Sequence, residues 1–167
     1  MLTYREEMPV DLPAIEVLLD RVFGYDRHAK ASYAFRRGVP PLVELSRVAV
    51  DAHGRLLATI RYWPIDVGGT PALLLGPVGV EPEWQGVGIG RTLIHETLAK
   101  VNALGVGAVF LVGDPAYYGP LGFEPAGGFA TMANENPKRL QARTLGAAHC
   151  LPRGEIRRAA PVLRAVG

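Results

Sequence analysis

Cysteine is almost absent from this sequence, since Cys150 stands alone among 167 residues. A single cysteine cannot form an intrachain disulfide, which fits a protein of the reducing cytoplasm. No histidine motif accompanies Cys150, so we expect a small buried hydrophobe rather than a nucleophile. Long apolar runs are also missing: the best, residues 108–112, is far shorter than the roughly 18 residues of a membrane span. The opening, residues 1–9, is charged and has no apolar signal region, so we expect neither export nor a membrane partner.

The sequence also lacks internal repeats, low-complexity tracts and any linker long enough to divide it. Its composition is 49% hydrophobic and 20% charged, which excludes a disordered chain, because disorder requires low hydrophobicity and high net charge. A chain of 167 residues has the size of one compact domain, so we expect a single domain over residues 1–167. Glycine (20 residues) and proline (14 residues) are abundant, and their positions are therefore informative.

Charge is nearly balanced over the whole chain, at +2, but it is unevenly distributed. Residues 138–167 carry seven basic side chains and one acidic side chain, whereas residues 1–137 are net negative. A basic segment can face nucleic acid or an anionic ligand, but its simpler interpretation is a solvated edge. No aromatic residue interleaves these arginines, so a surface that stacks single-stranded bases is not indicated, and we do not expect a nucleic-acid partner.

The order of apolar and turn residues predicts alternating strands and helices. A short strand over residues 2–5 precedes a helix that begins after an N-cap at Asp11 and ends near Gly24. A second, weaker helix is expected over residues 29–37. Three strands follow, of which the first two form a hairpin around a polar turn at residues 51–54. These strands are expected at residues 45–50, 56–65 and 72–80.

The second half begins with an amphipathic helix over about residues 87–104, whose apolar side chains recur at helical spacing. Residues 108–112 are expected to form a buried strand. Asp114 then caps a short helix that begins at Pro115 and ends at Tyr118. Further strands are expected at residues 129–133 and 143–150. Together these elements predict a mixed α/β sheet with helices on both faces.

Three alternate glycines, Gly86, Gly88 and Gly90, open the long helix shortly after the apolar strand at residues 72–80. Without Cβ atoms, successive backbone N–H groups can converge on one point, and the helix N-terminus adds partial positive charge. Arg91 can add a full charge, so the loop indicates a bound anion, most naturally a phosphate. A purely structural helix start is disfavoured, because each glycine costs roughly 1 kcal/mol of helix stability relative to alanine.

Two common phosphate-binding motifs do not fit this loop. A P-loop requires Gly-Lys-Ser/Thr at the helix entry, and the required lysine and hydroxyl residue are absent. A dinucleotide fingerprint requires G-x-G-x-x-G, but from Gly86 the final position is Arg91. From Gly88 the final position is Leu93, which also fails.

The pattern Gln85-x-x-Gly88-x-Gly90 resembles the Q/R-x-x-G-x-G/A signature of the GNAT superfamily of N-acetyltransferases. The resemblance implies an α/β (α+β) fold of GNAT type, with a mixed, mostly antiparallel central sheet flanked by helices. It also implies acetyl-CoA (coenzyme A) as co-substrate, with no metal. The glycine loop would hold the pyrophosphate, and the backbone of Val78–Val80 would pair with the pantetheine arm. The implied cofactor-binding residues are Val78, Gly79, Val80, Gln85, Gly86, Val87, Gly88, Ile89, Gly90, Arg91, Asp114 and Tyr117.

A second match lies after the strand at residues 108–112. Tyr118, Gly122 and Phe123 fit the Y-x-x-x-G-F pattern that ends this region in the superfamily, whereas Tyr117 does not fit the spacing. The resemblance implies that Tyr118 is catalytic and donates a proton to the departing thiolate of CoA. A phenol suits that role because it stays protonated at neutral pH. The alternative is that both tyrosines are packing aromatics.

Residues 113–118 and 122–126 together are similar to the YhbS-like branch of the superfamily. The commonest superfamily pattern has an asparagine and then an alanine on a longer helix before the tyrosine. Here Asp114 and Pro115 stand in that region and shorten the helix, so the contacts of that asparagine do not carry over.

The implied reaction is direct attack of a primary amine on the acetyl thioester in a ternary complex. A backbone N–H, that of Val80, would stabilise the oxyanion. The amine must also lose a proton, often through water to a carboxylate or a backbone carbonyl. Glu44, Glu81 and Glu83 are candidates, but the simpler interpretation of each is a surface carboxylate, so we assign no base from the sequence. His95 is expected to be exposed.

The acceptor is a small-molecule or peptide amine that nothing in the sequence selects. Residues of the second helix and the hairpin can line its site, although packing explains most of them equally well: Tyr33, Phe35, Arg36, Arg61, Tyr62 and Trp63. A non-catalytic sensor of CoA or acyl-CoA is the alternative function, and nucleic-acid binding through the basic segment ranks third. A homodimer stays open, as does an acyl group longer than acetyl.

Overall fold

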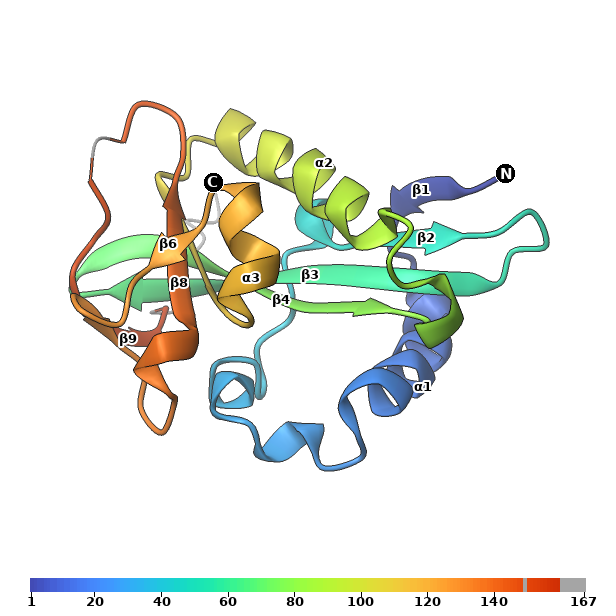
Figure 1. The fold of residues 1–167 in the computed structure, drawn as a ribbon, viewed down its shortest axis with the longest axis horizontal. Helices are drawn as coiled ribbons and strands as arrows, with labels where there is room; N and C mark the ends of the chain where they lie inside the picture. Colours follow the sequence, from blue (N-terminus) through green and yellow to red (C-terminus); the bar gives the residue numbers. More distant parts are fainter. Residues whose placement is uncertain (149, 160–167) are drawn as a thin grey trace, which may run out of the picture.

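The computed structural model describes residues 1–148 and 150–159. In these residues the strands form one sheet with the spatial order β1-β2-β3-β4-β5-β8-β6, while β9 pairs with the C-terminal end of β3 and with β7 (Figure 1). Along that order every neighbouring pair is antiparallel except β4 and β5. The predicted mixed, mostly antiparallel sheet is therefore confirmed. The strands are β1 (Thr3–Glu6), β2 (Arg47–Val50), β3 (Leu56–Val67), β4 (Thr70–Val80), β5 (Ala108–Val112), β6 (Glu124–Pro125), β7 (Ala130–Thr131), β8 (Leu140–Thr144) and β9 (Gly154–Arg158).

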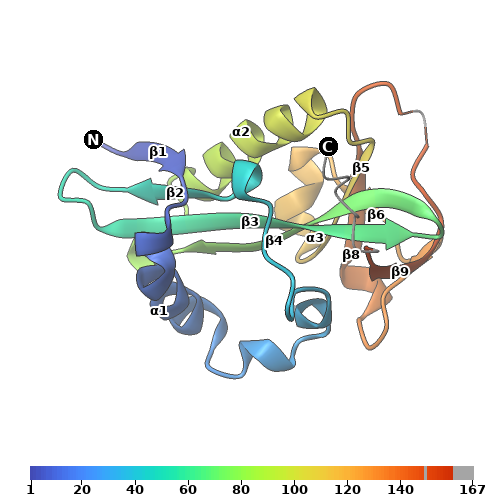
Figure 2. The same ribbon diagram turned by 180° about the vertical axis from the view of Figure 1, so that it is seen from behind.

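Helices cover both faces of this sheet, as Figures 1 and 2 show from opposite sides. The α-helices are α1 (Leu12–Phe23), α2 (Ile89–Ala103) and α3 (Pro115–Tyr118). On one face, α1 buries the stripe of Ile15, Leu18 and Leu19. On the other, α2 buries a stripe that includes Leu93 and Val101, and the tyrosines of α3 pack against the same apolar cluster. The helical periodicities in the sequence thus correspond to the faces that meet the sheet.

The elements expected before residue 119 are confirmed, apart from the second helix, with bounds shifted by at most two residues. β2 and β3 form the predicted hairpin. Asp51 closes its turn by accepting hydrogen bonds from the N–H groups of His53 (2.8 Å) and Arg55 (2.9 Å). Such local side-chain bonding is the reason that aspartate favours turns.

The predicted second helix over residues 29–37 is wrong. The segment folds instead into two short 3-10 helices, Arg27–Ala29 and Ala31–Phe35, separated by Lys30 in an extended conformation. Tyr33 and Phe35 are both buried. Residues two apart point in nearly opposite directions on an α-helix, so a surface α-helix could not bury both.

The strands predicted in the last third of the chain are wrong in their bounds. The strand at residues 129–133 is reduced to β7, and the one at 143–150 is replaced by β8, after which the chain turns at Gly146 (φ +61°). Residue 149 lies outside the described residues. The pattern does not predict β9, because Ile156 is its one buried side chain.

Cys150 is exposed, so the prediction of a buried cysteine is wrong. It follows the turn at Gly146, beyond the end of β8, where the chain has left the sheet. Within residues 1–148 and 150–159, no helix combines the length and apolar character needed to cross a membrane.

The sheet opens between β4 and β5. These strands pair, in parallel, through Leu73 with Val109 and Leu74 with Phe110. β4 then continues to Val80 and stays paired with β3 on its other side. Beyond Leu74, therefore, no strand of the described residues pairs with this edge of β4, which lies near the middle of the sheet rather than at its border.

The direction of the backbone groups on that edge follows from one hydrogen bond. The Glu81 N–H donates to the Leu57 carbonyl near the start of β3 (2.8 Å). Backbone groups of successive residues point to opposite edges of a strand. The N–H groups of Val78 and Val80 therefore point away from β3, into the gap beside β5.

Asp11 stands at the start of α1, as predicted, but its side chain does not cap the helix. Its carboxylate accepts two hydrogen bonds from the Arg5 guanidinium (2.7 and 2.8 Å) and one from the Met8 N–H (2.7 Å). Hydrogen bonding to Arg5 lowers the pKa of the Asp11 carboxyl, although burial opposes this shift. The carboxylate thus ties β1 to the start of α1.

Replacing this carboxylate tests its role. We expect Asp11→Ala to lower the free energy of unfolding by about 2 kcal/mol at pH 7, because the Arg5 guanidinium and the Met8 N–H lose their partner. A carboxyl with a lowered pKa stabilises the fold above its unfolded pKa and loses this effect as pH falls through the folded pKa. The difference between wild type and variant should therefore shrink below about pH 4.

Urea unfolding at pH 7 and pH 3 measures both effects. Glu155→Ala is the control, because it removes an exposed ion pair with Arg157 and should leave stability almost unchanged. An Asp11→Ala variant as stable as this control would contradict the assignment.

Candidate active site

A groove of about 680 Å³ runs along the glycine loop beside the part of β4 that follows Leu74, whose unpaired edge we call the bare edge of β4. We call this groove the glycine-loop groove. Of the predicted cofactor-binding residues, Gly79 and Asp114 lie outside its lining. Gly79 faces α1, where an added Cβ would lie 3.0 Å from Leu19 Cδ2. The lining residues are Val22, Phe23, Val78, Val80, Trp84, Gln85, Gly86, Val87, Gly88, Ile89, Gly90, Arg91, Tyr117 and Tyr118.

The three alternate glycines of this groove serve two different purposes. Gly86 (φ +81°) and Gly88 (φ +94°) adopt the left-handed conformation that favours glycine, and each has open space where a Cβ would be. Gly90 lies within α2, where an added Cβ would be 2.8 Å from the Tyr117 hydroxyl. The first two glycines shape the backbone, and the third lets Tyr117 approach the helix.

The N-terminus of α2 leaves backbone donors beside the groove. Gly88 is the N-cap and supplies no side chain, and the Thr92 N–H makes the first helical bond to the Gly88 carbonyl (3.0 Å). The N–H groups between them have no partner within the helix. Arg91 is exposed at the same end, with its guanidinium 6.0 Å from the centre of the Tyr117 ring. The arrangement favours an anion at this position.

Gln85 fixes the glycine loop to the strand. Its side-chain Nε2 donates a hydrogen bond to the Val80 carbonyl (3.0 Å). The first residue of the recognised motif thus holds the backbone of the loop, while the Val80 N–H keeps its direction into the gap.

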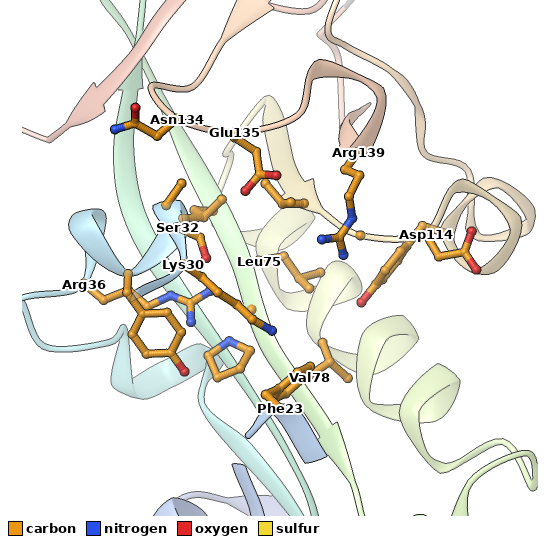
Figure 3. Close-up of a pocket in the computed structure, with 18 of the residues that line it drawn as sticks. Phe23, Lys30, Ser32, Arg36, Leu75, Val78, Asp114, Asn134, Glu135 and Arg139 are labelled. Carbon is orange, nitrogen blue, oxygen red and sulfur yellow. The ribbon is translucent and has the colours of Figure 1, made fainter. Parts of the chain in front are cut away.

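A second cavity of about 460 Å³ continues from the groove between the diverging ends of β4 and β5, and we call it the central cavity. Lys30, Ser32 and Arg36 line one side of it, and Glu135 and Arg139 reach in from the segment before β8 (Figure 3). Its remaining lining consists of Phe23, Ala29, Ala31, Tyr33, Leu74, Leu75, Gly76, Pro77, Val78, Val112, Gly113, Asp114, Tyr118 and Asn134.

The two cavities share three lining residues: Phe23, Val78 and Tyr118. Tyr118 therefore stands where one cavity passes into the other. For its hydroxyl the structure shows no hydrogen-bond partner within residues 1–148 and 150–159, so this group is available to a ligand. Burial raises the pKa of Tyr118, and the neighbouring Tyr117 raises it further. The hydroxyl consequently stays protonated well above neutral pH.

Packing holds the Tyr118 ring in place. The ring contacts Tyr117 and Phe123 edge-on, with centroid distances of 4.8 and 5.9 Å. It also lies directly against Gly113, where an added Cβ would be 2.5 Å from the ring. The buried Gln141 donates from Nε2 to the Gly113 carbonyl (3.1 Å) and so supports that backbone. The sequence analysis assigned no role to Gly113 or Gln141. A glycine at the end of a strand often marks the close approach of another group to the backbone, and this signal could have identified Gly113.

Asp114 caps α3, as predicted, by accepting a hydrogen bond from the Ala116 N–H (3.0 Å). It borders the central cavity rather than the glycine-loop groove, and its carboxylate points away from the other labelled side chains (Figure 3). Its role as a cofactor-binding residue stays a prediction.

The residues predicted to line the acceptor site are distributed over different places. Tyr33 and Arg36 line the central cavity, whereas Arg61 and Trp63 do not. Tyr62 is fully buried, and its hydroxyl lies 2.8 Å from Thr97 Oγ1 of α2. Phe35 is likewise a core residue.

None of the three carboxylates proposed as the base lines either cavity. Glu81 forms ion pairs with Arg21 and Arg55, and Glu83 lies 2.7 Å from Arg55. Glu44 is exposed, as is His95, for which exposure was predicted.

Glu135, which the sequence analysis missed, is the glutamate of the central cavity. It belongs to the irregular segment between β7 and β8, where no periodicity or motif distinguishes it.

Among the described residues, no group of three or more His, Cys, Asp or Glu side chains is placed to hold a metal ion. The described part of the basic segment at residues 138–159 has varied contacts. Arg143 donates to the Leu121 carbonyl (2.9 Å), Arg158 donates to the Arg37 carbonyl (2.6 Å), and Arg139 lines the central cavity. Residues 160–167 of this segment lie outside the described residues.

Comparison with known proteins identifies the family. The model of the GNAT acetyltransferase family matches residues 12–123. The N-acetyltransferase YhbS of Escherichia coli (strain K12) is 36% identical over 124 residues, which are 73% of this chain and 73% of that protein. The chain therefore belongs to the GNAT family of acetyltransferases, and it is an N-acetyltransferase by that membership, as its two motifs predicted.

Solved structures agree with this assignment. A crystal structure of YhbS from Escherichia coli in complex with CoA has a TM-score of 0.80 and 29% identity, covering 95% of this chain and 89% of its own. A GNAT family acetyltransferase from Brucella melitensis in complex with acetyl-CoA has a TM-score of 0.72 and 27% identity, covering 96% of this chain and 97% of its own. The predicted GNAT fold is confirmed.

The close contact between Gly113 and Tyr118 predicts the effect of one methyl group. We expect Gly113→Ala to destabilise the protein by about 1–3 kcal/mol, because the new Cβ must displace the Tyr118 ring. Gly128→Ala is the matched control, since nothing lies within 4 Å of its added Cβ and its φ lies outside the left-handed region. Thermal unfolding of both variants should show a lower melting temperature for Gly113→Ala alone. Equal melting temperatures would show that Gly113 does not position the ring.

Proposed function

We propose that the protein transfers the acetyl group of acetyl-CoA to a primary amine of a small molecule or peptide, by direct attack in a ternary complex. The observation that carries this proposal is that the glycine-loop groove and the central cavity meet at Tyr118. A donor in the groove and an acceptor in the cavity would bring their reacting groups to that junction. The relatives crystallised with CoA and acetyl-CoA support the identity of the donor.

The groove suits the two chemically different parts of CoA. Its pyrophosphate would accept hydrogen bonds from the free N–H groups at the start of α2, with Arg91 adding charge. The pantetheine arm carries amides, and the N–H groups of Val78 and Val80 point toward its path. An arm bound there would act as an added strand on the bare edge of β4.

At the junction of the two cavities, the reaction requires a hydrogen-bond donor that stabilises the oxyanion and an acid that protonates the leaving thiolate. As the amine attacks, negative charge develops on the thioester oxygen, and the Val80 N–H would stabilise it. The tetrahedral intermediate then releases CoA as its C–S bond breaks, and Tyr118 would donate its phenolic proton to the thiolate. The available hydroxyl of Tyr118 and its raised pKa support this role.

The amine must also lose a proton before or during attack. Glu135 lines the central cavity, in contrast to Glu44, Glu81 and Glu83. We therefore assign to Glu135 the acceptance of this proton, through water, in place of the three carboxylates considered from the sequence.

The proposal also includes the domain organisation of the protein and its location in the cell. All described strands join one sheet, which supports a single domain over residues 1–167. The single cysteine, Cys150, supports a cytoplasmic location, where thiols stay reduced.

The role of the glycine loop in CoA binding can be tested at Gly88. We expect Gly88→Val to weaken CoA binding at least tenfold, because a side chain strains the left-handed backbone that presents the N–H groups. Gly105→Val is the matched control: Gly105 also has a positive φ (+77°) and open space, but it follows the other end of α2. Isothermal calorimetry with CoA should separate the two variants. Similar affinities for both would overturn the assignment of the glycine loop to CoA binding.

The acid can be tested at Tyr118. We expect Tyr118→Phe to lower kcat about 100-fold while the dissociation constant for CoA stays nearly unchanged. In the wild type, kcat/KM should rise with pH as the amine loses its proton. No fall should occur below about pH 10, because the raised pKa keeps Tyr118 protonated. Steady-state kinetics over this range measures both effects, and full activity of Tyr118→Phe would remove Tyr118 as the acid.

A further inference from the structure

Arg36 is one of three cations that line the central cavity, together with Lys30 and Arg139. Its Nε is completely buried and has no hydrogen-bond partner among the described residues. The structure shows no ion pair between Arg36 and any described carboxylate, although its guanidinium points toward the middle of the cavity (Figure 3). A buried charge is normally paired, so an arginine in this situation requires a physical explanation.

The neighbouring arginines show what pairing looks like in this protein. Arg27 bonds Asp20 (2.8 Å) and Glu16, and Arg61 bonds Glu7 in bidentate geometry (2.9 and 2.7 Å). Both guanidiniums are therefore balanced within the chain. Arg36 lies beside this network, and no carboxylate of the described residues pairs with it.

The guanidinium of Arg36 is held firmly and remains charged. It lies over the Tyr33 ring at 4.5 Å and near the Trp63 ring at 5.9 Å, and the Trp63 indole donates to the Gly76 carbonyl (2.7 Å). Burial lowers the pKa of Arg36 to about 10, which still leaves a full positive charge at neutral pH. Stacking of this kind orients the planar group before any ligand arrives.

Gly76 leaves the end of this guanidinium accessible. An added Cβ at Gly76 would lie 3.1 Å from Arg36 Nη2, and the backbone there has a positive φ (+129°). A side chain at this position would crowd Nη2 from the β4 side. The absence of a side chain at Gly76 thus lets the Arg36 guanidinium keep its place in the lining of the cavity.

We propose that Arg36 binds a carboxylate of the acceptor, so that the substrate class is an amine that also carries a carboxylate. This inference rests on the proposed function, because it takes the central cavity as the acceptor site. The amine would lie at the Tyr118 and Glu135 end, and the carboxylate would accept hydrogen bonds from the Nη atoms of Arg36. A carboxylate matches a guanidinium in charge and planar geometry.

A carboxylate also fits the cavity better than a phosphate does. Glu135 borders the same space as Arg36, and its carboxylate would repel a doubly charged phosphate more strongly than a singly charged carboxylate. The apolar wall formed by Leu75 and Val78 lies between the two polar ends and suits a short methylene chain.

The test uses ω-amino carboxylates of increasing chain length, each with its carboxamide and its phosphonate. With wild-type protein and acetyl-CoA, one chain length should be preferred, and its carboxylate should exceed the carboxamide at least tenfold in kcat/KM. Arg36→Met should remove that preference while calorimetry shows unchanged CoA affinity. Arg36→Lys, which keeps the charge, should retain part of the preference.

Arg37→Met is the matched control, because Arg37 is the adjacent, exposed arginine and lies outside the central cavity. It should keep the preference for the carboxylate. Melting temperatures of all variants show whether Arg36→Met folds, and the comparison of acceptors in the wild type is independent of any variant.

The outcomes separate the two proposals. Transfer to no amine in the presence of bound acetyl-CoA would overturn the proposed function. Binding of the same compounds to the CoA complex, measured by calorimetry, then still tests Arg36. Equal or undetectable affinity for carboxylate and carboxamide, stronger binding of the phosphonate, or a preference that survives Arg36→Met would each overturn the carboxylate inference.

Discussion

The divergence of β4 from β5 after Leu74 determines where every part of the site lies. A continuous parallel pairing of these strands would have used the backbone donors of Val78 and Val80 within the sheet. Because the strands separate, the glycine-loop groove forms on one side of Tyr118 and the central cavity on the other. The sheet thus gives up hydrogen bonds within the protein and keeps them available for a ligand.

The arginines around α1 and the central cavity fall into two groups, which differ in whether a carboxylate of the described chain pairs with them. Arg5, Arg27 and Arg61 each have a carboxylate within the chain, and these pairs hold segments together. Arg36 and Arg139 line the cavity instead. The distinction between structural and ligand-directed cations depends on pairing and burial, and residue type alone does not reveal it.

Much of the fold could be predicted from the sequence because its signals are local. The apolar stripe of α1, the turn at Asp51 and the capped helix at Asp114 each depend on neighbours a few residues away. The glycine-loop groove was also predictable, because Gly86 and Gly88 indicate a left-handed backbone conformation that other residues rarely adopt.

The parts that could not be predicted depend on contacts between distant segments. Glu135 reaches the cavity only because the segment before β8 folds back over the sheet, and Gln141 supports Gly113 from 28 residues away. The sequence places Arg36 among the candidates for the acceptor site, but only the structure shows that no carboxylate of the described residues pairs with it. The exposure of Cys150 likewise follows from where β8 ends.

The bare edge of β4 has a thermodynamic consequence for the whole chain. A ligand that completes this edge binds the folded state and has no equivalent site in the unfolded chain. By mass action such a ligand adds about 2.7 kcal/mol of stability at a free concentration 100 times its dissociation constant. On the proposed function, acetyl-CoA would serve as a temporary strand as well as a substrate. The resistance of the protein to unfolding would then follow the supply of its own donor.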